Sequence, residues 1–220
     1  MLQRFWLIRH ALVDASALQR LYGTDDVPIC GRTMASQADR YAALANRLPR
    51  PARLICTPLS RTQHTAAAII RAGYPSQMPA IDAAFVEQDF GDYQGMPIAG
   101  FDARGSDTRH PFWPIHAAET PPGGESFHAM IARVGAGLNR LLGQQQANTV
   151  IISHGGAIRA CIAFALDLSA HQALCLAIDN ISLTRLEHNG HNWRVLSINE
   201  HISTLACETT PAASFAEAPQ

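Results

Sequence analysis

Three short runs of apolar residues along the chain predict buried strands. They span residues 5–9 (FWLIR), 53–56 (RLIC) and 148–153 (NTVIIS). Their apolar character is continuous rather than alternating, which is typical of strands covered on both faces. Between and after these runs, apolar residues recur with helical spacing, which predicts helices over 33–48, 57–72, 126–143 and 155–166. Thr57 is expected to cap the second of these helices.

The pattern near the end of the chain predicts a hairpin. Its strands span 181–188 and 191–199, joined by Asn189 and Gly190, the preferred pair for a two-residue type I′ turn. Because strands and helices alternate along the chain, the expected fold class is α/β, a three-layer α/β/α sandwich with a mostly parallel central sheet. We expect one domain over 1–207, followed by a flexible tail at 208–220 that is rich in Thr, Pro, Ala and Glu.

Residues 93–124 interrupt this alternation. The segment is rich in Gly, Pro, Asp and His and shows no sustained apolar period. A stretch of this length without regular structure inside a compact chain is typical of a functional lid. We therefore expect a short lid insertion here. Four of its residues are candidates to contact a substrate, although a solvated loop explains them equally well: Arg104, Arg109, His110 and Trp113.

Composition and charge exclude several classes of partner. The 220 residues carry 17 basic and 18 acidic side chains, so no overall field favours nucleic acid or a membrane surface. The five cysteines are scattered and form no CxxC pair, which indicates reduced thiols in a cytoplasmic protein. No apolar run approaches the roughly 18 residues of a membrane span, and the first run is too short for a signal peptide. The oligomeric state stays open, with a homodimer as one option.

Three of the predicted strand ends carry unusual polar residues. The first strand ends in Arg9 and His10, the second leads to Arg61, and the third runs into His154. Because ligands bind beyond the carboxyl ends of the strands in open α/β sheets, we expect these side chains to converge. Arginine matches phosphate oxygens, and each cation about 4 Å from an anion contributes roughly 4 kcal/mol near a protein surface. The set predicts a site for a phosphoryl group, with neutral imidazole as the nucleophile.

Six sequence motifs, in one order, resemble those of a known family. They are LIRHA, YGTDDVPICGRTMASQA, CTPLSRTQHTA, FVEQDFGDYQG, PGGES and IISHGGAIRA, and together they cover roughly residues 4–185. On these motifs the chain resembles the histidine phosphatase superfamily, the phosphoglycerate mutase-like group, and within it the alpha-ribazole phosphatase and broad-specificity phosphatase branches. The resemblance implies a phosphomonoesterase that hydrolyses a small phosphorylated metabolite through a phosphohistidine, with no metal ion and no cofactor.

The resemblance also implies roles for individual residues. His10 would be the nucleophile that is phosphorylated. Three side chains would hold the phosphoryl oxygens: Arg9, Arg61 and His154. The backbone N–H groups of Gly23 and Gly155 would bind the same phosphate. A loose phosphoryl-transfer transition state needs positioning and charge stabilisation from the protein more than covalent chemistry, which agrees with this set.

Glu87 would be the general acid for the leaving alcohol and then the base that activates water. A residue in this role is expected to be partly buried. Three further carboxylates lie nearby in the sequence and leave the assignment open at this point: Asp82, Asp89 and Asp92.

The chain departs from the family pattern at three positions. Ala11 stands where the family has glycine, and Val13 and Ser16 stand where it usually has a hydroxyl residue and an asparagine near the phosphate. Val13 cannot donate a hydrogen bond, whereas Ser16 can, so Ser16 is expected to contact substrate. These departures motivate one alternative, a catalytically impaired module that binds a phosphorylated ligand. A second alternative is mutase-like phosphoryl transfer, which is disfavoured because the family's glycolytic mutases carry a longer insertion.

Overall fold

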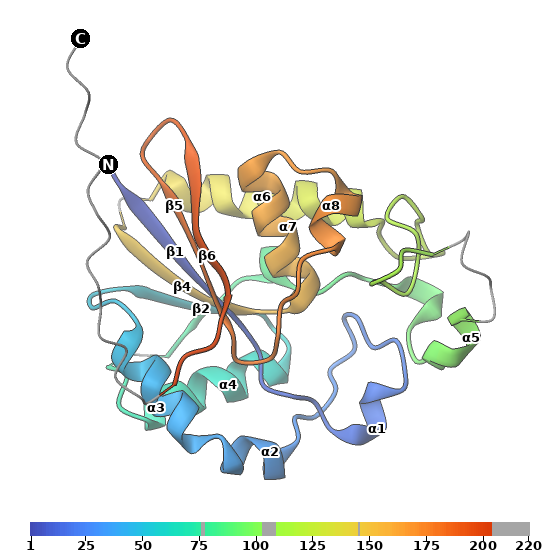
Figure 1. Cartoon of the computed structure of the whole chain (residues 1–220), viewed down its shortest axis with the longest axis horizontal. Coiled ribbons are helices and arrows are strands. Elements are labelled where there is room, and N and C mark those ends of the chain that lie inside the picture. Colours follow the sequence, from blue (N-terminus) through green and yellow to red (C-terminus); the bar gives the residue numbers. More distant parts are fainter. Residues whose placement is uncertain (76–77, 103–108, 145, 204–220) are drawn as a thin grey trace.

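The computed structural model describes residues 1–75, 78–102, 109–144 and 146–203. These residues form a six-stranded sheet with helices on both faces, which confirms the predicted α/β/α sandwich (Figure 1). The strands are β1 (Gln3–Arg9), β2 (Arg53–Cys56), β3 (Ala80–Ile81), β4 (Asn148–Ser153), β5 (Leu183–His188) and β6 (Trp193–Glu200). The helices are α1 (Ala15–Leu18), α2 (Gly31–Ser36), α3 (Ala38–Arg47), α4 (Ser60–Arg71), α5 (Ile98–Asp102), α6 (Phe127–Leu142), α7 (Gly155–Leu166) and α8 (Ala170–Leu174), with 3-10 turns η1 (Ala83–Phe85) and η2 (Gly91–Tyr93).

The order of strands in the sheet is β3-β2-β4-β1-β5-β6. The first four are parallel, β5 runs antiparallel to β1, and β6 runs antiparallel to β5. Arg9, the last residue of β1, lies opposite Ser153, the last residue of β4. On the other side of β4, Cys56 of β2 lies opposite Ile152. The carboxyl ends of these three strands therefore lie side by side at one edge.

Side chains from β1 alternate between two apolar cores, one on each face of the sheet. Phe5 and Leu7 pack with α6 and α7, whereas Trp6 and Ile8 pack with α3 and α4. Continuous apolar runs were needed for this arrangement because both faces of each central strand are covered. In Figure 1, α1 and α5 lie beyond the carboxyl ends of the central strands. No helix in the described part of the chain is long and apolar enough to cross a membrane.

Two local predictions are wrong. The helix predicted over 33–48 is two helices, α2 and α3, separated at Gln37. The Ser36 hydroxyl bonds to the carbonyl oxygen of Thr33 at 2.9 Å, a local contact that competes with continuation of a helix. The hairpin turn is also longer than predicted. A type I′ turn needs positive φ at both central residues, but only Gly190 has it, and Asn189 instead accepts N–H groups from residues 191 and 192.

The predicted lid segment, residues 93–124 and called the lid below, contains in its described part the short helix α5, which the pattern did not predict. Arg104 and the tail at 208–220 lie outside the described residues, so those two predictions stay predictions.

Candidate active site

The carboxyl edge of the sheet gathers most of the predicted site. The N–H of His10 donates to the carbonyl oxygen of Ser153 at 2.9 Å, which places the residue after β1 beside the residue after β4. The rings of His10 and His154 consequently meet edge to face, with centroids 5.1 Å apart. The third strand end, that of β2, leads into α4, whose second residue is Arg61.

His10 is held in one tautomer. The residue is 2% exposed, and its Nδ1 lies 2.7 Å from the carbonyl oxygen of Ala11. A carbonyl oxygen can only accept, so Nδ1 carries the proton and Nε2 keeps its lone pair. Burial lowers the pKa of His10 well below its usual value, and the positive charges of Arg61 and Arg9 lower it further. The ring is therefore neutral near pH 7, the form that is nucleophilic.

His154 has the opposite tautomer. The Nε of Arg61 donates to Nδ1 of His154 at 3.2 Å, so the proton is on Nε2, which donates to the Thr57 hydroxyl at 3.0 Å. Burial lowers the pKa of His154 well below its usual value, with further lowering by His10 and Arg61. The prediction that Thr57 caps α4 is wrong, because α4 begins at Ser60 and has no side-chain cap. Thr57 instead orients His154.

Arg61 is completely buried and is clamped by backbone carbonyl groups. Its Nη1 donates to Asp25 and its Nη2 to Gly23, both at 2.6 Å. With the bond to His154, three of its five N–H groups are used and two remain for an anion. Gly23 has φ +33, and a Cβ there would lie 2.4 Å from the carbonyl oxygen of Gln88, so only glycine fits this approach.

Glu87 reaches the same edge from the loop after η1. It is 9% exposed, in agreement with the partial burial predicted for it. One carboxylate oxygen accepts the N–H of Gly156, in the first turn of α7, at 3.0 Å, and the other accepts the N–H of Gln88 at 3.0 Å. A Cβ on Gly156 would lie 2.2 Å from Oε1 of Glu87, the oxygen that accepts the Gln88 N–H, so glycine is needed for this close approach.

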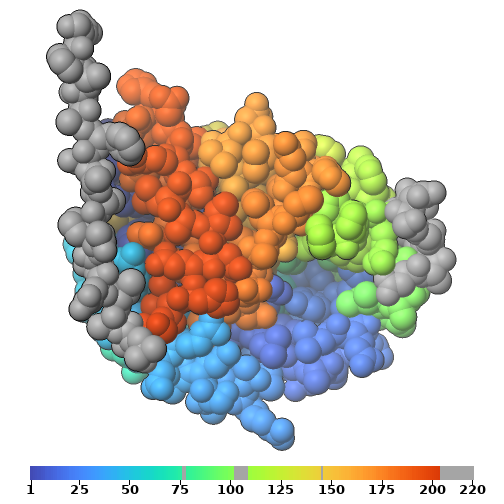
Figure 2. Space-filling view, in the orientation of Figure 1, coloured from blue at the N-terminus to red at the C-terminus, as the bar shows by residue number. Residues whose placement is uncertain are grey.

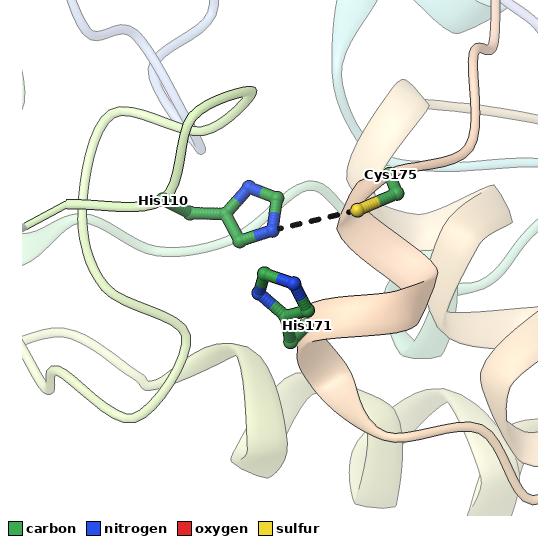
Figure 3. A group of neighbouring side chains, drawn as sticks. All are labelled: His110, His171 and Cys175. Atoms are coloured by element: carbon green, nitrogen blue, oxygen red, sulfur yellow. Dashed lines mark hydrogen bonds between the residues drawn. The ribbon is translucent and has the colours of Figure 1, made fainter.

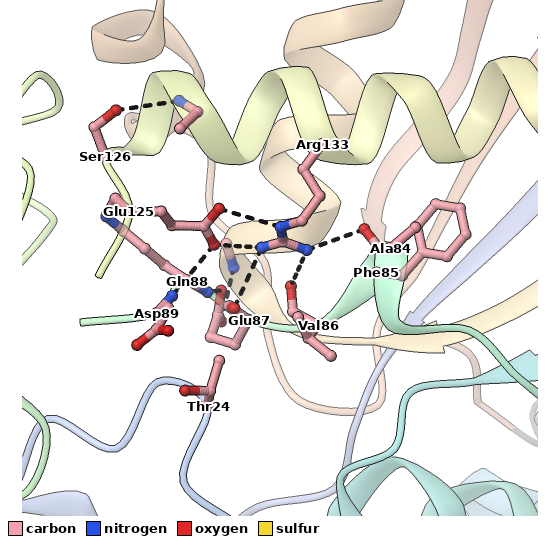
Figure 4. Close-up of polar contacts among 12 residues, drawn as sticks. Thr24, Ala84, Phe85, Val86, Glu87, Gln88, Asp89, Glu125, Ser126 and Arg133 are labelled. Atoms are coloured by element: carbon pink, nitrogen blue, oxygen red, sulfur yellow. Dashed lines mark hydrogen bonds and ion pairs between the residues drawn. The ribbon is translucent and has the colours of Figure 1, made fainter. Parts of the chain in front are cut away.

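The loop that carries Glu87 is fixed by Arg133 of α6 (Figure 4). The Arg133 guanidinium donates to the carbonyl oxygens of Ala84 and Val86 at 3.0 and 3.2 Å, and forms an ion pair with Glu125. It also donates to the Glu87 carbonyl oxygen at 3.4 Å. Sequence analysis missed Arg133, since nothing in the helical pattern distinguishes it from a surface arginine.

The other three carboxylates near Glu87 in the sequence contact other groups. Asp82 caps η1 and forms an ion pair with Arg140. Asp89 accepts the N–H of Gly91, and Asp92 lies beside Gly123. Glu87 is the one of the four that lines the cavity described next. The geometry therefore favours Glu87 for the acid role.

A cavity of about 260 Å³ opens above this edge. It lies between the blue N-terminal segment, the green lid and the orange C-terminal half, which border a recess on the face shown in Figure 2. Four of the predicted site residues line it: Arg9, Gly23, Glu87 and Gly155. His10, Arg61 and His154 are more deeply buried and are not among its lining residues. The Nε of Arg9 is buried, and no acceptor among the described residues is within hydrogen-bond distance of it.

Two further residues line the cavity on its lid side. Arg159 of α7 lies over the ring of Trp113, 5.5 Å from its centroid, and donates to the carbonyl oxygen of Leu176 at 2.7 Å. Burial lowers the pKa of Arg159, an effect that the negative charge of Glu87 opposes. Trp113 donates through its indole N–H to Gln88, at 2.7 Å, which ties the lid to the Glu87 loop. Trp113 was a candidate from sequence, whereas Arg159 was missed although it lies in the last of the six motifs.

The three departures from the family pattern have definite places. Ala11 has no positive φ, is 1% exposed and packs in the core on the α3 and α4 side, so its methyl group is accommodated. Val13 is also buried. Ser16 lies exposed in α1 with its hydroxyl on Asp14 at 2.8 Å, and it does not line the cavity. A substrate contact for Ser16 therefore stays a prediction.

Comparison with known proteins identifies the family of this chain. A family model described as the histidine phosphatase superfamily (branch 1) matches residues 5–201. The bifunctional protein Rv2228c of Mycobacterium tuberculosis is 30% identical over 185 residues, which cover 84% of this chain and 50% of that protein. The chain thus spans about half the length of this curated relative.

Two solved structures share the fold. The mycobacterial glucosyl-3-phosphoglycerate phosphatase Rv2419c, in complex with VO3, has a TM-score of 0.75 at 25% identity, with 90% of this chain and 99% of that chain covered. An Escherichia coli protein provisionally named alpha-ribazole-5′-P phosphatase has a TM-score of 0.74 at 23% identity, with 93% and 99% covered.

The family match covers the residues that the structure brings together at this edge. The matched span contains all six motifs, and with them His10, Arg61, Glu87 and His154. A match that runs through every strand of the sheet, with the motif residues assembled at its carboxyl edge, shows that this chain belongs to branch 1 of the histidine phosphatase superfamily.

Proposed function

We propose that the protein is a metal-independent phosphomonoesterase that acts on a small phosphorylated metabolite through a phosphohistidine at His10. One observation carries the proposal: His10 is buried and neutral, and its Nδ1 proton is held by a carbonyl oxygen, so the unprotonated Nε2 is available to phosphorus. A neutral imidazole beside two arginines is suited to attack on an anionic ester.

The phosphoryl dianion would be bound by N–H groups that have no acceptor among the described residues. Arg9 offers its unpartnered Nε, and Arg61 offers two unused N–H groups. Gly155 begins the twelve-residue helix α7, whose N-terminal amides and dipole also favour an anion. Each arginine about 4 Å from the phosphate contributes roughly 4 kcal/mol at the effective dielectric of a protein surface. These residues supply the charge neutralisation that a metal ion provides in other phosphatases.

The reaction would proceed in two displacements. In the first, Nε2 of His10 forms a bond to phosphorus, the bond to the leaving oxygen breaks, and protonated Glu87 gives its proton to that oxygen. In the second, the Glu87 carboxylate takes a proton from water, the water oxygen attacks phosphorus, and the N–P bond breaks to release phosphate and His10. The position of Glu87 in the cavity lining supports its role on the leaving-group side.

The direct test is hydrolysis of p-nitrophenyl phosphate by EDTA-treated protein, together with trapping of acid-labile protein phosphate. Wild type should turn over and acquire label, and His10→Asn, which keeps a polar side chain of smaller size, should do neither while retaining its circular dichroism spectrum. Turnover by His10→Asn, or label that survives in it, would exclude the phosphohistidine route. Loss of turnover in EDTA that metal restores would exclude metal independence.

Two additional measurements, of phosphate binding and of 3-phosphoglycerate conversion, separate the two alternatives. Folded wild-type protein that binds inorganic phosphate but neither turns over nor acquires label would be the impaired binding module. Conversion of 3-phosphoglycerate to its 2-phospho isomer faster than its hydrolysis would identify mutase-like transfer.

A further inference from the structure

A second group of chemically active side chains lies outside the reaction cavity, between the lid and α8. Figure 3 shows the ring of His110, from the lid, facing the sulfur of Cys175, with the ring of His171 beside both. His171 lies in α8 and Cys175 is its C-cap residue. Their spacing of four residues places them on one face of the helix, where two side chains can reach a common point. Cys175 is 65 positions after His110, so only the folded chain brings the group together.

The distances within this group are close to those of a metal site. One ligand atom from each residue lies within 4.8 Å of the others, and Nε2 of His110 is 3.8 Å from Sγ of Cys175. Around a tetrahedral zinc ion with bonds of about 2.1 Å to nitrogen and 2.3 Å to sulfur, ligand atoms are roughly 3.4–3.6 Å apart. The His110–Cys175 pair is already near that separation. Changes of rotamer in the two exposed residues, His171 and Cys175, can shorten the remaining distances to the tetrahedral values.

We propose that His110, His171 and Cys175 bind one zinc ion, which joins the lid to α8. Two imidazoles and one thiolate favour zinc over magnesium or calcium, which prefer oxygen ligands. Three protein ligands leave a fourth tetrahedral position for water. In the described part of the chain this is the only group of three His, Cys or acidic residues whose ligand atoms lie this close together.

The hydrogen bond made by His110 predicts a structural response to metal binding. Its Nδ1 now accepts the N–H of Phe112 at 3.1 Å. A metal ion on Nε2 would move the ring proton to Nδ1, and the bond to Phe112 would be exchanged for the metal–nitrogen bond.

Zinc would therefore act on the lid next to the reaction cavity. Phe112, Trp113 and Pro114 follow His110 within four residues, and all three line that cavity. Neither His110, His171 nor Cys175 lines it, so the metal site is separate from the phosphoryl site. The proposed hydrolysis does not depend on this metal, and turnover in EDTA tests it independently.

Cobalt binding tests the proposal, because tetrahedral Co²⁺ with a thiolate ligand has visible d–d bands and a near-ultraviolet charge-transfer band. Metal-free, untagged full-length protein should bind one Co²⁺ with both signals, and Zn²⁺ should displace it. Cys175→Ser should lose the charge-transfer band, and His171→Ala should weaken affinity by about 100-fold or more. Free zinc at about 100 times its Kd should raise the Tm of wild type by roughly 5–10 °C, and that rise should be absent in Cys175→Ser.

Matched variants serve as controls. His116→Ala removes an exposed histidine from the same lid segment, and Cys30→Ser removes a free cysteine far from α8 in sequence. Both should bind cobalt as wild type does. The proposal is overturned if wild type gives no tetrahedral spectrum, if Cys175→Ser retains the charge-transfer band, or if the two controls lose binding equally.

Discussion

Replacing Gly156 by alanine should displace the proposed general acid without disturbing the phosphate site. A Cβ at this position would lie 2.2 Å from Oε1 of Glu87, whereas ordinary van der Waals contact begins at 3.4 Å, so the carboxylate must move by about 1.2 Å. A misplacement of about 1 Å can cost around 100-fold in rate, equivalent to about 2.7 kcal/mol in the activation free energy. The Trp113 ring, 3.0 Å from the same Cβ, needs to move by only a few tenths of an ångström.

The assay compares kcat/KM for two esters, glycerol phosphate and p-nitrophenyl phosphate. In a two-displacement reaction kcat/KM covers only the steps up to release of the alcohol, so it reports protonation of the leaving oxygen and excludes hydrolysis of the phosphohistidine. Glycerol is a poor leaving group and should show the loss of about 100-fold. Nitrophenolate needs little protonation and should show less than about a tenfold loss.

Stability should change little in Gly156→Ala. Alanine improves helix propensity by up to about 1 kcal/mol, while the lost hydrogen bond from the Gly156 N–H to the carboxylate costs roughly 1.5–3 kcal/mol. The free energy of unfolding should therefore shift by less than about 2 kcal/mol. Gly31→Ala is a matched control, because Gly31 also lies in the first turn of a helix and a Cβ there contacts nothing within 4 Å.

A double variant tests whether the loss acts through Glu87. Gly156→Ala combined with Glu87→Gln should be no slower than Glu87→Gln alone. Both substitutions remove proton donation by Glu87, so their effects on the rate should not add. Equal losses for the two esters in Gly156→Ala, or an additional loss on top of Glu87→Gln, would refute the reasoning.

Three further predictions concern the buried histidines, the Glu87 loop and the core. The pKa values of His10 and His154 are lowered in the folded protein, so below about pH 6.5 the unfolded chain binds more protons, and the free energy of unfolding should fall as pH falls, by up to about 1.4 kcal/mol per pH unit for each histidine. Urea unfolding in phosphate-free buffer from pH 7.5 to 5.5 should show this slope, reduced by about half in His10→Asn; an unchanged slope would contradict it. Arg133→Met should loosen the Glu87 loop, lowering kcat/KM about tenfold for glycerol phosphate but not for p-nitrophenyl phosphate, and equal effects on both esters would indicate a purely structural role. Leu138→Ala, at a fully buried position of α6, should cost about 2–5 kcal/mol in chemical denaturation while turnover of the folded protein stays unchanged; a smaller cost would mean that the core collapses around the truncation.

Much of the convergence of residues at the candidate site could be predicted from the sequence because it depends on strand ends. A continuous apolar run identifies a strand covered on both faces, and parallel strands bring their carboxyl ends to one edge whatever their exact order. Arg9, His10 and His154 directly follow such runs, so their convergence did not require knowledge of side-chain packing. The β2 strand needed only a short connection to bring Arg61 to the same edge.

The tertiary structure decided the features that depend on contacts between distant segments. Thr57 has the sequence of a helix cap, but in the fold its hydroxyl lies against His154, 97 positions away. Arg133 has the spacing of any helical arginine, and only the packing of α6 against η1 turns it toward the carbonyl groups of the Glu87 loop. The approach of His110 to Cys175 depends on how the lid folds back over α8. Apolar periodicity is a local property that the sequence carries in full, whereas the partners of a polar side chain depend on which elements pack together, and so they are determined only in the folded chain.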